Sequence, residues 1–296
     1  TGGSIRLPAA CCGIVGIKPT QGRVSRHGVM PLSFSQDCVG PLARSVGDAY
    51  QMLQLIAGPD GRDPTCRKRP LGAIAPDISA LRIGVGQGAF AEGLSDEVAA
   101  AMSDAIKALE PATSTVAAIG MADFDAVAEL ANVVAMAEAG AVHFDWLRDR
   151  PDDYGPQVGM RLAQALAMPA PIYIRALQIR AVMLRQVLDS VFVDCDVLVV
   201  PAMPFLPPMA ADVDVGAGAK MNSVVSDMTR FTRLFSYLGL PVVTLPAARS
   251  RDGLPVGVQI VAAPWREDLA ASVAAHLEQV LALGPFLATQ STRSAA

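Results

Sequence analysis

The chain opens with Thr1-Gly-Gly-Ser-Ile-Arg-Leu-Pro-Ala-Ala10, and Cys12-Gly-Ile-Val-Gly-Ile-Lys-Pro-Thr20 follows almost at once. The two glycines before Ser4 allow backbone conformations that are closed to other residues, and they let a substrate approach the main chain closely. Successive N–H groups in such a turn can converge on an anion beside the serine hydroxyl. A nucleophile flanked by aimed backbone donors is what acyl transfer requires, so the pattern predicts a nucleophile at Ser4.

Downstream of this opening, short apolar runs alternate with amphipathic stretches. The apolar runs predict buried strands at 12–17, 81–85, 116–119, 196–200, 242–245 and 256–262. Helical spacing predicts helices at 45–57, 95–109, 123–148, 172–193, 229–238 and 267–283, the first opened by the capping-box-like Ser45-Val-Gly-Asp48. Strands that alternate with helices predict an α/β fold, with a large mixed β-sheet covered by helices on both faces.

Composition narrows the class of protein. Among 296 residues, 52% are hydrophobic and 18% charged, which excludes intrinsic disorder. The longest charge-free stretches, 197–211 and 234–248, are interrupted by proline and are shorter than the ~18 residues of a membrane span. A net charge of −4 without basic runs argues against direct binding of nucleic acid. We therefore expect a protein that spans no membrane and binds no nucleic acid directly.

The numbers and spacing of cysteine and histidine residues indicate the redox compartment and the cofactors to expect. The five cysteines form no CxxC pair and are odd in number, which favours reduced thiols in a cytoplasmic setting over a disulfide framework. The three histidines lie far apart in the sequence, so we expect no metal, and no motif calls for another cofactor.

Further segments extend the pattern of the opening. They are Gly22-Arg-Val-Ser25, Gln36-Asp-Cys-Val-Gly-Pro41, Ile56-Ala-Gly-Pro-Asp60, Asp196-Val-Leu-Val-Val-Pro-Ala-Met-Pro204, Gly239-Leu-Pro241 and Gly253-Leu-Pro-Val-Gly-Val-Gln259. Together with residues 1–20, they resemble the amidase signature family. The resemblance is close over residues 1–65 and looser over 190–282.

The resemblance implies a fold and a set of site residues. In that family a Ser-cisSer-Lys triad hydrolyses amides, so Ser4 would be the nucleophile. The N–H groups of Thr1, Gly2, Gly3 and Ser4 would form the oxyanion hole, and Arg6 would support this loop. The family's lysine base and bridging serine lie upstream of the point where this sequence begins. Carried over, this predicts that the chain alone is inactive.

The same resemblance predicts how the domain is organised. We expect residues 1–296 to form a single amidase domain of the amidase signature fold, truncated at its N-terminus. Within it, 1–65 would be the end of the signature region, 66–190 a variable helical region, and 191–283 the C-terminal strands and helices.

The resemblance implies a small-molecule amide as substrate and, as the reaction, hydrolysis of this carboxylic amide to a carboxylate and ammonia or an amine. Three alternatives stay open. They are the A-type component of a glutamyl-tRNA amidotransferase-like enzyme, a catalytically incomplete remnant, and an N-terminal nucleophile at Thr1 with its own α-amino group as base. The identity of the amide and the presence of a homodimer stay open as well.

Several other residues invite a functional interpretation. Lys18 matches a family position other than the triad lysine, so we interpret it as structural. His27 is expected to form hydrogen bonds in a loop, and His143 with Asp145 would point to different faces of a helix. A solvated helix edge is expected for Arg175, Arg180 and Arg185, buried packing for Cys11 and Cys12, and a pocket wall for Met203, Phe205 and Met209.

Overall fold

The structure is a computed structural model that describes residues 1–121 and 124–286, with side chains described outside 122–125. Its strands form one mixed sheet in the order β2-β1-β6-β7-β5-β3-β4. The strands are β1 (Val15–Lys18), β2 (Leu42–Ala43), β3 (Arg82–Gly86), β4 (Thr115–Ile119), β5 (Val197–Pro201), β6 (Val242–Arg249) and β7 (Pro255–Ala262). In this order, the neighbouring strands β2, β1, β6, β7 and β5 pair antiparallel to one another. Strand β3 pairs parallel with β5 on one side and with β4 on the other. This confirms the expected mixed sheet.

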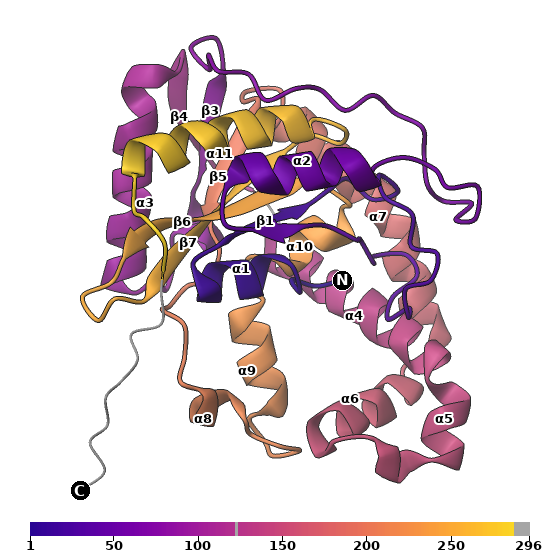
Figure 1. The fold of residues 1–296 in the computed structure, drawn as a ribbon. Helices are drawn as coiled ribbons and strands as arrows, with labels where there is room; N and C mark the ends of the chain where they lie inside the picture. Colours follow the sequence, from indigo (N-terminus) through magenta and orange to yellow (C-terminus); the bar gives the residue numbers. More distant parts are fainter. Residues whose placement is uncertain (122–123, 287–296) are drawn as a thin grey trace, which may run out of the picture.

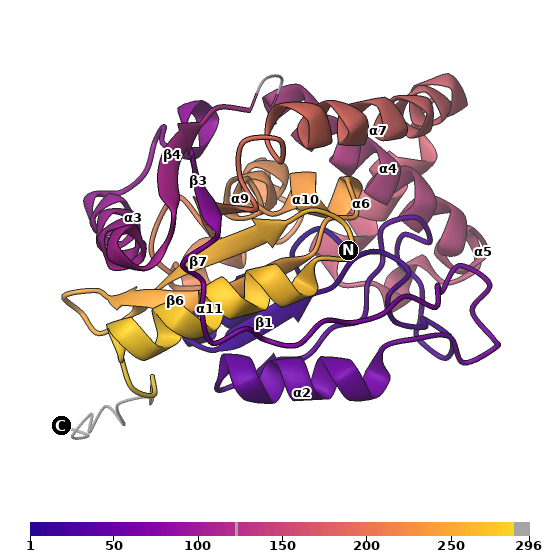
Figure 2. The same ribbon diagram turned by 90° about the horizontal axis from the view of Figure 1, so that it is seen from above.

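Helices cover both faces of this sheet, as Figures 1 and 2 show. On one face lie α2 (Val46–Ile56), α3 (Asp96–Leu109) and α11 (Glu267–Leu281), whose apolar side chains share a core with the sheet. On the other face lie α1 (Arg6–Cys12), α4 (Phe124–Val142), α7 (Ala170–Ser190) and α10 (Arg233–Tyr237). The remaining helices are α5 (Phe144–Asp149), α6 (Pro156–Leu166), α8 (Ala210–Val213) and α9 (Met221–Met228).

Strand β5 shows why a continuous apolar run forms this layered arrangement. Successive side chains of a strand point to opposite faces of the sheet. Val197 and Val199 accordingly join the core under α2, α3 and α11. Leu198 and Val200 join the core under α4, α7 and α10. A strand that is covered on both faces needs apolar residues at every position, which is what the sequence contains.

Local signals located several elements correctly. Helix α2 begins after Ser45, whose hydroxyl accepts a hydrogen bond from the N–H of Asp48 at 3.1 Å, as the capping pattern predicts. The turn at Asp252 and Gly253 joins the antiparallel strands β6 and β7, and Gly253 adopts a positive φ of 82°. In the described part of the chain, no helix combines the length and the apolar character needed to cross a membrane.

Several boundaries differ from the sequence expectations, including the helix expected at 229–238, of which α10 covers only Arg233–Tyr237. The run at 12–17 is not a single strand, because α1 extends to Cys12 and Gly13 ends it with a φ of 65° before β1 begins at Val15. The expected helix at 123–148 is interrupted at His143, which separates α4 from α5, and residue 123 lies outside the described residues. Helix α6 lies between the helices expected at 123–148 and 172–193, where no individual helix was predicted within the expected helical region 66–190.

Candidate active site

Ser4 lies in a tight turn immediately before α1. Its side chain is exposed, while Gly3 is buried next to Thr232 and Leu7. The carbonyl of Gly3 accepts a hydrogen bond from the N–H of Leu7 at 2.8 Å, so the turn leads directly into the helix. Within residues 1–121 and 124–286, no acceptor pairs with the N–H groups of Gly2, Gly3 or Ser4. These donors are therefore available to an anion beside the Ser4 hydroxyl.

The packing of this turn explains why Gly3 is glycine. A Cβ atom at position 3 would lie 2.6 Å from the hydroxyl oxygen of Thr232, which is closer than van der Waals contact allows. The same hydroxyl donates a hydrogen bond to the carbonyl of Gly2 at 2.7 Å. The loop that precedes α10 thus holds the turn from behind.

Arg6 anchors the turn to β7 and to α10. Its guanidinium is fully buried and donates to Ser236 Oγ at 2.7 Å and to Gln259 Oε1 at 3.1 Å. Gln259 in turn donates to the carbonyls of Pro201 and Phe231, at 3.0 Å each. Burial lowers the pKa of Arg6. The arrangement ties the start of α1 to β5, β7 and α10.

A carboxylate connects the turn to the segment 32–37. Asp37 accepts hydrogen bonds from the Thr1 hydroxyl and from the N–H groups of Leu32 and Ser33, the latter two at 2.8 and 3.0 Å. Glu138 of α4 also contacts this segment: its buried carboxylate accepts a hydrogen bond from Ser33 Oγ at 2.5 Å. The position of Thr1 therefore depends on contacts that reach the variable helical region.

Arg180 of α7 also holds this segment, and the prediction that it forms part of a solvated helix edge is wrong. Its guanidinium donates to the Ser35 carbonyl at 2.7 Å and to Gln21 Oε1 at 2.6 Å. It also lies 5.7 Å from the ring centroid of Tyr237. The helix packs this face inward, whereas Arg175 and Arg185 are exposed as expected.

A cavity of about 720 Å³ opens in front of Ser4. The nucleophile turn forms one side of it, and α4, α6 and α9 supply most of the other walls. Its lining is largely apolar, with Arg161, Arg233 and Glu129 as charged members. The expected wall residues Met203, Phe205 and Met209 are not among its lining. Met203 is buried instead and contacts Cys11 Sγ at 3.9 Å.

Lys18 lies behind Ser4, at the end of β1. Both residues line a second, small cavity of about 10 Å³. The Lys18 ammonium is buried and donates to the carbonyls of Leu240 and Pro19 at 2.7 and 3.0 Å, and to Cys38 Sγ at 3.8 Å. Burial lowers its pKa to about 8. The sequence does not predict this burial, because a lysine at the end of an apolar run is usually exposed.

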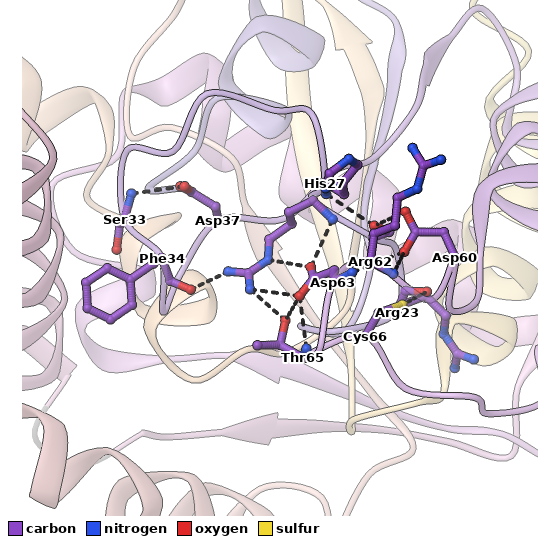
Figure 3. Close-up of polar contacts among 12 residues, drawn as sticks. Arg23, His27, Ser33, Phe34, Asp37, Asp60, Arg62, Asp63, Thr65 and Cys66 are labelled. Carbon is purple, nitrogen blue, oxygen red and sulfur yellow. Dashed lines mark hydrogen bonds and ion pairs between the residues drawn. The ribbon is translucent and has the colours of Figure 1, made fainter.

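The histidines lie apart from the turn. His27 is exposed, and its N–H donates to Ser25 Oγ within a loop that the Arg26–Asp63 ion pair stabilises at 3.0 Å (Figure 3). His143 pairs with the hydroxyl of Tyr154 at 3.0 Å rather than with an acid.

All five cysteines are free, and Cys12 is exposed rather than packed as expected. Across the part of the chain that the structure describes, no cluster of three His, Cys, Asp or Glu side chains could hold a metal ion.

The profile of the family described as Amidase matches residues 1–270. The chain is 36% identical over 274 residues to AtzE, a 1-carboxybiuret hydrolase component of Pseudomonas sp. (strain ADP), covering 91% of this chain and 59% of that protein. It is 34% identical over 315 residues to the A-type component of the glutamyl-tRNA(Gln) amidotransferase of Oleidesulfovibrio alaskensis, covering 96% of this chain and 64% of that protein.

Solved structures agree with the sequence comparison. A structure described as a vestigial protein complex that reveals the origins of an s-triazine catabolic enzyme superposes with a TM-score of 0.86 at 33% identity. It is covered over 63% of its length by 97% of this chain. For 6-aminohexanoate cyclic dimer hydrolase the TM-score is 0.82 at 26% identity, with 95% of this chain and 63% of that one covered. The chain thus spans less than two thirds of these relatives.

Proposed function

The chain belongs to the Amidase family, and on that premise we propose that it contributes the nucleophile and the substrate cavity of an amidase. The reaction would be hydrolysis of a carboxylic amide to a carboxylate and ammonia or an amine. One observation carries the proposal: an exposed serine and three backbone N–H groups, for which residues 1–121 and 124–286 contain no acceptor, belong to residues that line a cavity of about 720 Å³.

The chemistry would follow from these groups. Ser4 Oγ attacks the amide carbonyl, and the carbonyl oxygen gains negative charge in the tetrahedral intermediate. The N–H groups of Thr1 to Ser4 stabilise that charge. Collapse of the intermediate breaks the C–N bond, releases the amine with a proton, and leaves an ester on Ser4. Water then cleaves the ester and restores the serine.

The proton must leave Ser4 through a base, and Lys18 is poorly placed for this role. Its ammonium group already donates hydrogen bonds to the carbonyls of Pro19 and Leu240. The other lysines, Lys68, Lys107 and Lys220, are exposed. We infer that residues 1–296 by themselves hydrolyse amides slowly. Loss of the base of a serine hydrolase costs on the order of 10⁴–10⁶ in rate.

Thr1 is a weaker candidate for the nucleophile than Ser4. Its hydroxyl donates to Asp37 rather than facing the cavity unpartnered. We therefore assign Thr1 to the oxyanion turn, with Arg6 as the residue that supports it.

Residues 1–65, 66–190 and 191–283 would form a single domain, since each contributes strands to the same sheet. The free cysteines favour a reducing compartment such as the cytoplasm.

A second candidate function is favoured by the similarity to the A-type component of glutamyl-tRNA(Gln) amidotransferase. In that case the ammonia released at Ser4 would be transferred to an acceptor held by a partner protein. The two functions differ in a measurable way. An amidase releases free ammonia or amine when the protein is alone, whereas a transferase component depends on its partner and acceptor.

The test of the nucleophile uses a fluorophosphonate probe and amide hydrolysis. The protein expressed from its complete reading frame is expected to be labelled at Ser4, and Ser4→Ala to lower kcat by about 10⁴–10⁶. Ser190→Ala serves as a control, because Ser190 lies at the exposed end of α7. Labelling at another residue, or full activity in Ser4→Ala, would refute the assignment. Rapid labelling of the 296-residue chain would refute its low intrinsic activity.

A further inference from the structure

The charge in the large cavity is unbalanced. Two guanidinium groups, those of Arg161 and Arg233, line a space whose walls are mostly apolar. The carboxylate that lines the same space, Glu129, has a side chain that is 67% exposed. Two desolvated cations that face one solvated anion leave positive charge directed at the cavity. Such a site favours an anionic ligand.

Arg233 lies directly against the nucleophile turn. Its Cγ would be 3.6 Å from a Cβ atom placed on Gly2, so its aliphatic part packs on that glycine. The Arg233 side chain is only 12% exposed. Nη2 donates to Ser226 Oγ at 2.8 Å, and Nη1 lies 3.9 Å from Glu129 Oε1. Its Nε is buried and has no acceptor among the described residues.

Arg161 approaches the same space from α6 with even less compensation. Its guanidinium donates to Met136 Sδ at 3.7 Å, and a thioether is a weak acceptor. Among the residues that the structure describes, Arg161 forms no ion pair. Burial lowers the pKa of both guanidiniums, and the charge of Arg161 lowers the pKa of Arg233 further. Arg161 and Arg233 line the same cavity, so both cations act on a ligand that occupies it.

We propose that Arg161 and Arg233 bind a carboxylate that is part of the amide substrate. The inference rests on the proposed amidase function and names the substrate class of the same site. A guanidinium offers a planar fork of N–H donors that matches a carboxylate, and a desolvated fork without a partner is costly. Because Arg233 packs on Gly2, the carboxylate lies a few bonds from the scissile carbonyl. The monoamide of a dicarboxylic acid has this form.

The test compares two substrates of the same length on the protein expressed from its complete reading frame. Pentanedioic acid monoamide carries the carboxylate, and pentanamide is its neutral counterpart. We expect kcat/KM to be at least 10-fold higher for the monoamide. A hydrogen bond to a charged group contributes enough to expect about 10- to 100-fold loss of this preference in Arg161→Gln and in Arg233→Gln. The loss should fall mainly on KM.

Controls separate binding from folding and from chemistry. Arg185→Gln removes an exposed arginine on α7 that lies outside the cavity, and it should leave the preference unchanged. Arg161→Lys and Arg233→Lys keep the charge without the fork and should lose less of the preference than the glutamine variants. Equal losses on both substrates in the glutamine variants would overturn the proposal, because that result indicates a structural role.

A binding measurement keeps this proposal apart from the proposed function. In Ser4→Ala protein, calorimetric titration should show tighter binding of the monoamide than of pentanamide, and this difference should shrink when Arg161→Gln is added. Hydrolysis of pentanamide without any preference for the monoamide would overturn the carboxylate site and leave the amidase function standing. Arginine-dependent binding without hydrolysis would support the site and refute the amidase function.

Discussion

Residues 1–65 and the helical region 124–229 contribute to the same cavity in different ways. The first region buries charged groups and pairs each with specific partners, as Arg6, Lys18 and Arg23 show. The second presents mainly apolar or small side chains to the cavity, and its Arg161 has only a thioether as acceptor. Buried polar networks enforce one geometry, whereas apolar walls accept substitution. The first region therefore positions the reacting groups, and the second selects what reaches them.

The largest expected effect concerns the stability of the first region. Arg23 and Glu267 form an ion pair of 2.7 Å, with 1% and 0% of their side chains exposed. Arg23→Gln leaves the Glu267 charge buried without its partner. We expect the free energy of unfolding to fall by about 3–5 kcal/mol in a urea titration. Arg185→Gln, which breaks an exposed pair with Asp189, should cost below about 1 kcal/mol. Equal costs would contradict the contrast between the two regions.

The next effect concerns catalysis at the turn. Gly3→Ala places a Cβ atom 2.6 Å from Thr232 Oγ1, so the turn must shift and misplace its N–H donors. We expect kcat to fall by about 10²–10³, as for loss of one oxyanion donor. Gly2→Ala, whose Cβ would meet Arg233 at an ordinary 3.6 Å, should lose less activity. Adding Thr232→Ala to Gly3→Ala should restore part of the rate, and no restoration would exclude the steric explanation.

A pH titration tests the structural role of Lys18. Its pKa is lowered to about 8 by burial, so between pH 8 and its ordinary value near 10.5 the unfolded chain binds one more proton than the folded chain. Stability due to this group therefore rises with pH across that window. Relative to Lys18→Met, the free energy of unfolding should gain about 2–3 kcal/mol from pH 7 to pH 10. A difference that is independent of pH would show that Lys18 is not desolvated.

The smallest expected effect lies in the cavity wall. Ala135→Leu adds apolar volume on the α4 side of the cavity. A change of this size in an apolar pocket is worth about 1–3 kcal/mol, so kcat/KM for bulky amides should fall roughly 10-fold. Small amides should be affected less, and kcat for them should change little. A uniform loss of kcat for all amides would mean that the wall also positions the reacting groups.

Much of the fold could be predicted because its signals are local. The apolar run of β5 and the Ser45 cap of α2 both depend on residues adjacent in the chain. The same holds for Ser4, whose neighbours at positions 2, 3 and 6 resemble a family motif. Boundaries were harder, since Gly13 ends α1 through its positive φ and the sequence pattern alone suggested a strand there. The wall residues were missed because α6 has no distinctive motif.

By itself the sequence determined the α/β class, the mixed sheet and the resemblance that singled out Ser4, because periodicity and short motifs depend on near neighbours. Only the tertiary structure decided the surroundings of Ser4. It brings Arg161 and Arg233 to one cavity and buries Lys18 behind the turn. It also turns Arg180 inward, where its guanidinium contacts Ser35 and Gln21, which precede it in the chain by 145 and 159 positions. Such contacts depend on how whole elements pack, and a desolvated charge is defined only by that packing.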